Sequence, residues 1–370
     1  MKTAIISFFA IVFSMTLVAG PDSADAIIRL LNSRSAGSPR KFNEAARAVY
    51  KEAEKGRPLQ QYVMALVADD KMLPRDLQLS KEKRNEYFAA SGGKIQALAE
   101  KKGNALAWYL LSLQNNDETM LKRAADGNNV QALNAWGILN LNKALSNKDL
   151  SQKELEAALG DSFRCFKRAA GMKDGNGYYN LGMCYLHGWG TEQKLSIALD
   201  CFRSAAEQSH SEAINNIGGF FRDGIVVARD KAMAAKWFEK SAKLQNAYGE
   251  LNYALALQRG EGVEVDEKRA VQLLEDSSAK GCVEALNALG MCYYEGSGVE
   301  KNLRKAFELY ETAAKAGYAT SMENLAVCYD SGAGVEKDAG QAMIWKVRAR
   351  AARGDRNAIA WLTQNGHTLK

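Results

Sequence analysis

The chain repeats itself every 36 residues between about Tyr178 and Gly354. A period of this length indicates one supersecondary unit stacked several times, with a continuous hydrophobic core shared by neighbouring units. Such a stack recognises partners along an extended surface, whereas most enzymes use a single cavity. The period is carried by small residues at two positions of each copy: Gly182, Gly218, Ala254, Gly290 and Ala326 at the first, and Ala198, Ala234, Ala270, Ala306 and Ala342 at the second.

The composition favours long helices in a soluble, folded chain. Only 4 of the 370 residues are proline, and alanine, leucine, lysine and glutamate are frequent. The formal net charge is +6, with acidic and basic residues interspersed in every copy. This pattern is typical of a mixed, solvated surface, so we expect no nucleic-acid partner.

Each copy reads as a first helix (helix A), a glycine-containing loop and a second helix (helix B). In the fourth copy, apolar residues recur at helical spacing over 283–294. Gly296 and Gly298 then end the helix, because glycine adopts left-handed backbone angles at little cost. Where the two helices cross, the recurring Gly or Ala lets the backbones approach closely. The second copy has Val226 in place of the second loop glycine, so we expect a reshaped loop there.

The beginning of the chain has the pattern of a secretory leader. Lys2 precedes an uncharged apolar run, residues 4–19, and Ala24-Asp25-Ala26 follows as a cleavage site with small residues. We expect cleavage after Ala26 and an exported bacterial protein, periplasmic or extracellular, with no membrane span after cleavage. The alternative is an uncleaved anchor, although the run is short for a bilayer.

The period blurs toward the N-terminus but does not stop. A helix A over 130–142 and a helix B over 151–172 are separated by an insertion near 143–152. The resulting division is a signal peptide (1–26), degenerate helical repeats (27–129), a repeat with an inserted loop (130–176), five 36-residue repeats (177–354), and a C-terminal capping helix with a tail (355–370).

The fourth copy also carries a family likeness. Its string Leu289-Gly-Met-Cys-Tyr293-Tyr-Glu-Gly296-Ser-Gly298-Val, followed by Lys305-Ala and by Ala313-Ala-Lys-Ala-Gly, resembles the Sel-one-like repeat, a relative of the tetratricopeptide repeat. The resemblance implies an all-α fold, namely a right-handed α-solenoid (superhelix) of antiparallel helix pairs. It also implies a scaffold or adaptor for protein or peptide partners, as in exported bacterial members.

In the related tetratricopeptide fold, helix A lines a concave groove, so the resemblance implies a binding face on helix A. Counted from the small residue, we expect the positions three before, one after and five after to face outward. Asparagine pairs with peptide backbones, methionine gives an adaptable apolar floor, and arginine meets carboxylates. The alternative is that these residues only face solvent. The candidate residues are Tyr179, Met183, His187, Asn215, Arg222, Asp223, Arg259, Asn287, Met291, Tyr294, Glu295 and Glu323.

Little in the sequence indicates catalysis. The three histidines, His187, His210 and His367, lack a metal-ligand spacing, and the glycine loops follow helices and not strands. We therefore expect no metal, no cofactor and no catalytic residue. We also expect a monomeric chain.

One alternative function is a periplasmic cell-wall enzyme of the β-lactamase type, or a glycan binder, because some relatives have been linked to penicillin binding. The pattern Ser-x-x-Lys occurs, but the companion motifs Ser-Asp-Asn and Lys-Thr-Gly are missing. The three occurrences are Ser38/Lys41, Ser80/Lys83 and Ser277/Lys280.

The cysteines leave two possibilities open. An exported chain can form disulfides, and a pair among Cys165, Cys184 and Cys201 is one possibility; buried thiols are the other. Cys292 and Cys328 lie one period apart and are expected to fill the core.

Overall fold

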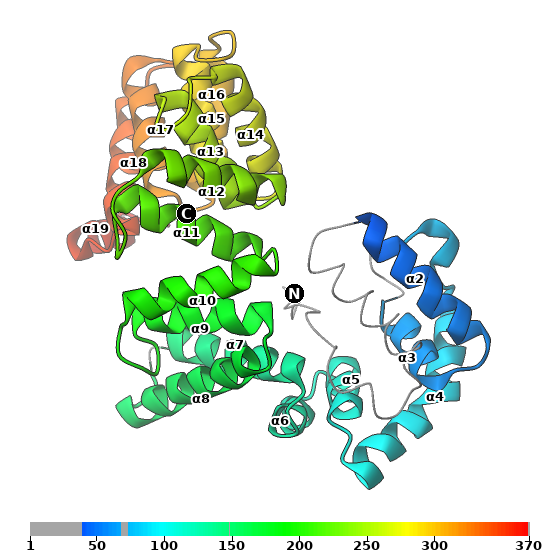
Figure 1. Cartoon of the computed structure of the whole chain (residues 1–370). Helices are drawn as coiled ribbons and strands as arrows, with labels where there is room; N and C mark the ends of the chain where they lie inside the picture. The colour runs from blue at the N-terminus through cyan, green and yellow to red at the C-terminus, as the bar shows by residue number, and fades with distance from the viewer. Residues whose placement is uncertain (1–38, 68–72, 148, 369–370) are drawn as a thin grey trace. The chain divides into compact units, whose positions relative to one another are not determined.

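The computed structural model describes residues 39–67, 73–147 and 149–368 (Figure 1). Within these ranges the regular structure is helical without any strand, and consecutive helices within each unit pack on one another, so the predicted all-α solenoid is confirmed. The expected signal peptide and Ser38 lie outside the described residues. Among the helices described, none is both long and apolar enough to cross a membrane.

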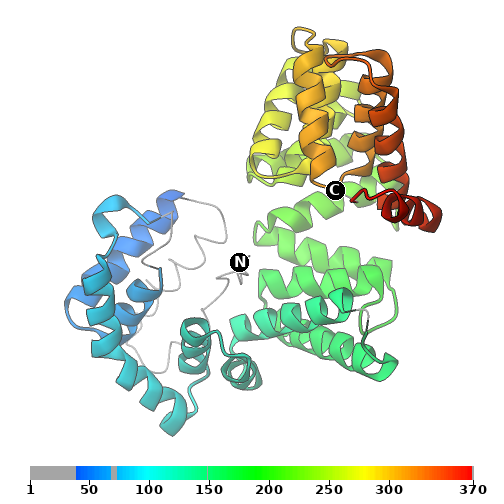
Figure 2. The same ribbon diagram turned by 180° about the vertical axis from the view of Figure 1, so that it is seen from behind.

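The chain divides into two compact units, Met1–Ala213 and Ile214–Lys370 (Figures 1 and 2). The helices of the first unit are α2 (Pro39–Glu54), α3 (Pro58–Val67), α4 (Lys81–Lys102), α5 (Ala105–Asn115), α6 (Glu118–Asp126), α7 (Val130–Ser146), α8 (Gln152–Gly171), α9 (Gly175–His187) and α10 (Leu195–Glu207), with a short 3-10 helix at Arg75–Leu77.

Helix α11 (Ser211–Asp223) contains the boundary between the units. The second unit continues with α12 (Lys231–Lys243), α13 (Ala247–Arg259), α14 (Glu267–Ala279), α15 (Val283–Glu295), α16 (Leu303–Lys315), α17 (Ala319–Ser331), α18 (Ala339–Ala352) and α19 (Arg356–Gln364). From α9 onward the odd-numbered helices up to α17 are helix A and the following even-numbered ones helix B.

The ends of the repeat helices follow from local sequence. Asn246 precedes α13, and its side chain accepts a hydrogen bond from the amide of Gly249 at 2.8 Å, which caps the helix N-terminus. Gly260 ends the same helix with a φ of 64°, in the left-handed region. The glycines that end α9, α15 and α17 have the same conformation. The predicted helix–glycine–helix unit is confirmed.

The small residue of each helix A lies against the facing helix B. A Cβ added at Gly290 would stand 2.6 Å from the ring of Tyr310, and one added at Gly218 would stand 2.5 Å from the ring of Phe238. Gly182 faces Phe202 in the same way. Where helix A has alanine, the residue at the aromatic position of helix B is not aromatic: Ala254 is followed by Leu274, and Ala326 by Lys346. The small residue therefore makes room for one aromatic ring.

The expected reshaping of the loop at Val226 is wrong. Val226 has a φ of 65°, and the loop keeps the same succession of turn and bends as the loop with Gly262. The valine thus accepts a left-handed backbone that disfavours branched side chains. Its side chain is 53% exposed.

The insertion predicted near 143–152 is partly helical, because α7 extends to Ser146 and α8 begins at Gln152. α7 has 17 residues and α8 has 20, whereas the helices of the next repeat, α9 and α10, have 13 each. The additional residues lengthen both helices, and their connection is short. Ser151 caps α8 reciprocally with Glu154, which explains why the second helix begins at Gln152.

The core of the repeats contains the recurring alanines and all six cysteines. Ala306 has no exposed surface, and the helix-B alanines of the other copies are also buried. The cysteines are free and buried, as the second possibility predicted. Burial raises the pKa of Cys184 to about 12, with the neighbouring Cys201 as a smaller contribution in the same direction.

Candidate functional site

The A helices of the second unit form a row. A polar side-chain contact joins each consecutive pair of A helices. The contacts are Asn252 Nδ2 to Asn215 Oδ1 (2.8 Å), Gln258 Nε2 to Cys292 Sγ (2.9 Å), and Asn324 Nδ2 to Asn287 Oδ1 (2.9 Å).

The position three before the small residue is turned toward a neighbouring helix, so our prediction that it faces outward is wrong for several repeats. Asn287 is only 7% exposed, and its oxygen also accepts a hydrogen bond from Ser321 Oγ. Leu251 is equally buried. Tyr179 stacks on His210 with 4.4 Å between the ring centroids, and burial raises the pKa of Tyr179 to about 12. Glu323 is more exposed but forms an ion pair with Arg353.

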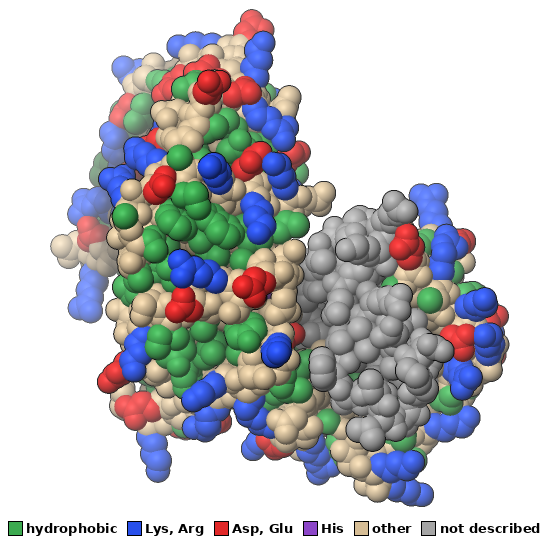
Figure 3. All heavy atoms as spheres, in the orientation of Figure 1, with side chains coloured by type: hydrophobic (Ala, Val, Ile, Leu, Met, Phe, Trp, Pro, Cys, Tyr) green, Lys and Arg blue, Asp and Glu red, His purple; other side chains and the backbone are tan. Residues whose placement is uncertain are grey.

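The position one after the small residue does face outward, and it carries an apolar side chain in α13, α15 and α17. Met291 is 44% exposed and Val327 is 49% exposed, while Leu255 is half-buried. We call Leu255, Met291 and Val327 the apolar row. Met183 occupies the same position in the first unit and is half-buried. On the face seen in Figure 3, hydrophobic side chains gather in patches over the repeat helices, bordered by Lys and Arg side chains.

The position five after the small residue is exposed and carries mixed charge. His187 stacks on Trp189 with 4.5 Å between the centroids. Asp223 accepts two hydrogen bonds from Arg222, at 2.8 and 2.9 Å. Arg259 and Glu295 are also exposed, and Tyr294 lies beside Glu295 with the Lys301 amine 5.9 Å from its ring centroid.

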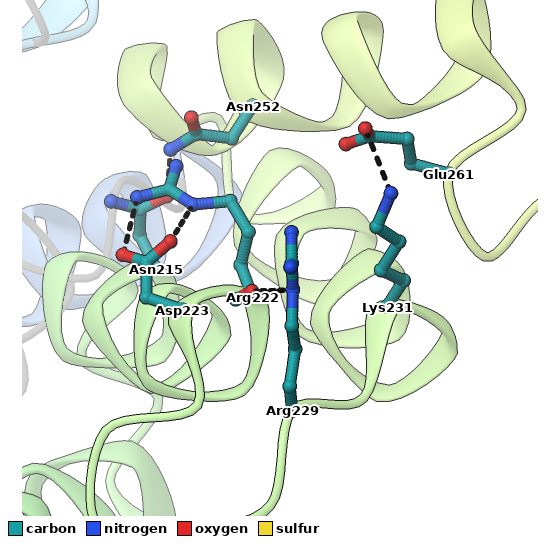
Figure 4. Close-up of polar contacts among 7 residues, drawn as sticks. All are labelled: Asn215, Arg222, Asp223, Arg229, Lys231, Asn252 and Glu261. Atoms are coloured by element: carbon teal, nitrogen blue, oxygen red, sulfur yellow. Dashed lines mark hydrogen bonds and ion pairs between the residues drawn. The ribbon is translucent and has the colours of Figure 1, made fainter.

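Two of the predicted residues meet in one hollow between α11, α12 and α13. Its walls include Arg222, Lys231, Phe238, Leu255, Arg259 and Glu261, which we call the basic hollow. Figure 4 shows Arg222, Arg229 and Lys231 pointing toward α13 and its following loop, where Glu261 pairs with Lys231 at 3.0 Å. Sequence reasoning missed Lys231, Phe238 and Glu261 because it considered helix A alone. The sequence feature that could have indicated this hollow is Lys231, the first residue of α12.

Hydrogen bonds and charge interactions link these charged groups into one cluster. The hydrogen bond from Arg222 and the charges of Arg222 and Arg229 hold the pKa of Asp223 below its usual value. The hydrogen bond from Lys231 lowers the pKa of Glu261, and the charges of Lys231, Arg259 and Arg229 add to it. Both carboxylates are therefore ionised at neutral pH. Each is paired with one cation, which leaves Arg229 and Arg259 as uncompensated positive charges in the cluster.

The described Ser-x-x-Lys pairs have structural roles. Ser80 caps α4 by accepting a hydrogen bond from the amide of Lys83 at 3.2 Å. Ser277 Oγ donates to the carbonyl of Ala247 at 2.7 Å, and Lys280 forms an ion pair with Glu250. The hydroxyl of Ser80 thus caps α4, and the hydroxyl of Ser277 joins α14 to α13. Across the part of the chain that the structure describes, no group of three or more His, Cys, Asp or Glu side chains is placed to hold a metal ion.

These helix pairs with a shared core define an all-α repeat solenoid. A family model described as the Sel1 repeat matches five consecutive segments, residues 175–210, 211–246, 247–282, 283–318 and 319–346. Residues 175–346 of the chain therefore consist of Sel1-like repeats. This fold suggests a protein-interaction scaffold, and proteins of this class are generally not enzymes.

Two solved structures illustrate the likeness. A Sel1 repeat protein from Oxalobacter formigenes is 28% identical with a TM-score of 0.54, and the match covers 63% of this chain and 94% of that one. A protective antigen of uropathogenic Escherichia coli strains, which displays an SLR fold, is 21% identical with a TM-score of 0.42, covering 93% of this chain and 80% of that one. Among curated proteins, none matches this chain.

Proposed function

We propose that this chain is an exported adaptor that binds a protein or peptide partner across the A helices of its Sel1 repeats. The observation that carries the proposal is the apolar row. Its side chains lie on neighbouring helices, and Met291 and Val327 remain about half exposed although the core is complete without them. Exposed apolar side chains that line up across a repeat surface are typical of a partner-binding face.

The test compares two variants that each replace one exposed methionine and one exposed valine by serine. Met291→Ser with Val327→Ser removes the exposed part of the apolar row. Val265→Ser with Met343→Ser removes two side chains that are 59% and 51% exposed and lie off the row. Each protein is immobilised, and the partners captured from the envelope fraction of the source cells are quantified by mass spectrometry.

We expect the first variant to lose the partners that the unmodified chain captures, and the second to keep them. Circular dichroism melting should be within about 1 °C for all three proteins, since exposed substitutions change stability by roughly 0.5 kcal/mol or less. Undiminished capture by the Met291/Val327 variant would show that the partner binds elsewhere.

Export is the second part of the proposal, and the leader pattern in residues 1–26 supports it. The intact mass of the chain purified from its native cells is the direct measurement. A mass that corresponds to a chain beginning at Ile27, recovered outside the cytoplasm, is the expected result. A full-length cytoplasmic chain would contradict it.

A further inference from the structure

We propose that the basic hollow binds an internal Asp or Glu side chain of a peptide segment whose apolar neighbours lie on the apolar row. This inference rests on the proposed function and names the chemistry of the partner. The hollow and the row are continuous because Leu255 belongs to both. A bound segment that follows the row over α15 and α13 therefore reaches the hollow at α13.

The charge of the hollow selects a carboxylate. Three cationic side chains, Arg222, Lys231 and Arg259, line the hollow together with one carboxylate, Glu261, and the pair Arg229 and Asp223 lies close to them. Arg229 donates a hydrogen bond from Nε to the backbone oxygen of Arg222 at 3.0 Å, which fixes its guanidinium beside Arg222. Arginine pairs with carboxylates through two parallel hydrogen bonds.

The same two carboxylates disfavour a more highly charged ligand. A phosphate or nucleic-acid backbone would bring further negative charge beside Asp223 and Glu261, which are both ionised. A single carboxylate brings only one negative charge beside them, and one arginine can donate hydrogen bonds to both of its oxygens. The walls contributed by Phe238, Ala234 and Ala235 are apolar, so the stem of an acidic side chain packs against them.

The surface beyond the hollow is open, which favours an internal residue over a chain end. Gly219 occupies on α11 the position of the apolar row, and a Cβ added to it would meet no atom within 4 Å. A peptide backbone can therefore continue past the hollow across α11. A chain-terminal carboxylate would gain nothing from this open space.

The experiment measures fluorescence anisotropy of three labelled peptides with the full chain. The first has the core Leu-Leu-Asp-Glu-Leu-Leu with an acetylated N-terminus and an amidated C-terminus. The second replaces Asp-Glu by Asn-Gln, and the third is the second with a free C-terminal carboxylate. We expect the first to bind about fivefold more tightly than the second, an advantage that shrinks as salt rises.

The variants locate the effect. Arg259→Gln and Arg229→Gln should each reduce the preference for the acidic peptide, because each removes one uncompensated charge. Arg356→Gln makes the same charge change at an exposed residue of α19 outside the hollow and should leave the preference unchanged.

Three outcomes overturn the inference. They are no binding of any peptide, equal affinity for the acidic peptide and the amide peptide, and tighter binding of the third peptide, which has the free carboxylate, than of the acidic peptide. The proposed function is tested separately. If these peptides fail but partner capture still depends on Met291 and Val327, the chemistry of the partner is wrong while the adaptor function stands.

Discussion

At the residue scale, Val226 shows how one repeat departs from its neighbours without changing its backbone. Glycines occupy the corresponding place in other loops, where an added Cβ would lie close to a carbonyl oxygen of the preceding repeat: 2.2 Å from that of Lys231 for Gly262, and 2.4 Å from that of Glu267 for Gly298. Val226 holds the same left-handed conformation with a branched side chain. Backbone strain of this kind costs about 1–2 kcal/mol.

Val226→Gly should stabilise the chain by about 0.5–1 kcal/mol, since the relief of strain exceeds the added entropy of the unfolded glycine. Urea denaturation of the variant and the unmodified chain measures the difference. Val265→Gly is the matched control, because Val265 is a similarly exposed loop valine without a positive φ, and it should not stabilise. A lower urea midpoint for Val226→Gly than for the unmodified chain would show that Val226 is not strained in the folded chain.

His210 gives the chain a pH-dependent contact at the N-terminus of α11. The amide of Ala213 donates to His210 Nδ1 at 3.4 Å, so the neutral imidazole caps the helix. Burial lowers the pKa of His210 below 6.5, and the nearby Glu212 carboxylate opposes this only in part. The unfolded chain therefore takes up the proton more readily than the folded chain. Its contribution to stability is complete above about pH 6.5 and is lost as the pH falls from there toward the folded pKa.

His210→Asn should flatten the dependence of the melting temperature on pH between 7 and 5. Asparagine retains a cap acceptor, as Asn246 does in the next repeat, but does not titrate. Thermal melts across this pH range, compared as slopes, measure the effect. Identical slopes for the two proteins would exclude His210 as the titrating group.

At the element scale, the crossing of helix A and helix B depends on a pair of residues, one on each helix. Glycine accompanies an aromatic ring in three of the five regular copies, and alanine accompanies leucine or lysine in the other two. In the three glycine copies the aromatic ring occupies the space where a Cβ would otherwise lie. This explains why the small position varies between Gly and Ala while the helices keep their length.

Gly290→Ala should destabilise the chain by about 2 kcal/mol, because its Cβ would overlap the ring of Tyr310. In a Tyr310→Leu background, the same substitution should be nearly neutral, as the natural pair Ala254 and Leu274 indicates. Urea denaturation of the four proteins in this double-mutant cycle gives the coupling energy. Additive effects would show that Gly290 is not required to make room for the ring of Tyr310.

At the scale of the whole molecule, the chain consists of two compact units, each with its own network of contacts. Three buried cysteines report on each: Cys165, Cys184 and Cys201 on the first, and Cys282, Cys292 and Cys328 on the second. Burial raises the pKa of Cys165, Cys201, Cys292 and Cys328 to about 11, so few thiolates form at pH 8. Alkylation therefore requires local or global opening.

Pulsed alkylation along a urea gradient, read by peptide mass spectrometry, should label the three cysteines of a unit in one transition. The physical reason is that each repeat is stabilised by its neighbours, so a unit opens as a whole. A fully unfolded sample is the control for complete labelling. Labelling of the three cysteines of one unit at clearly separate urea concentrations would contradict cooperative units.

The amino-acid sequence alone predicts the repeat, the helix pairs, the loop glycines and the burial of Ala306, Cys292 and Cys328. These features are periodic, and each depends on residues that are close along the chain. Tertiary packing sets which side of each helix A is free, because that depends on how one helix A lies on the next. It turned Asn287 inward to an adjacent helix and left Met291 outside. It also brought Arg222, Lys231 and Glu261 to one hollow from three separate segments, since ion pairs between distant residues leave no periodic trace in the sequence.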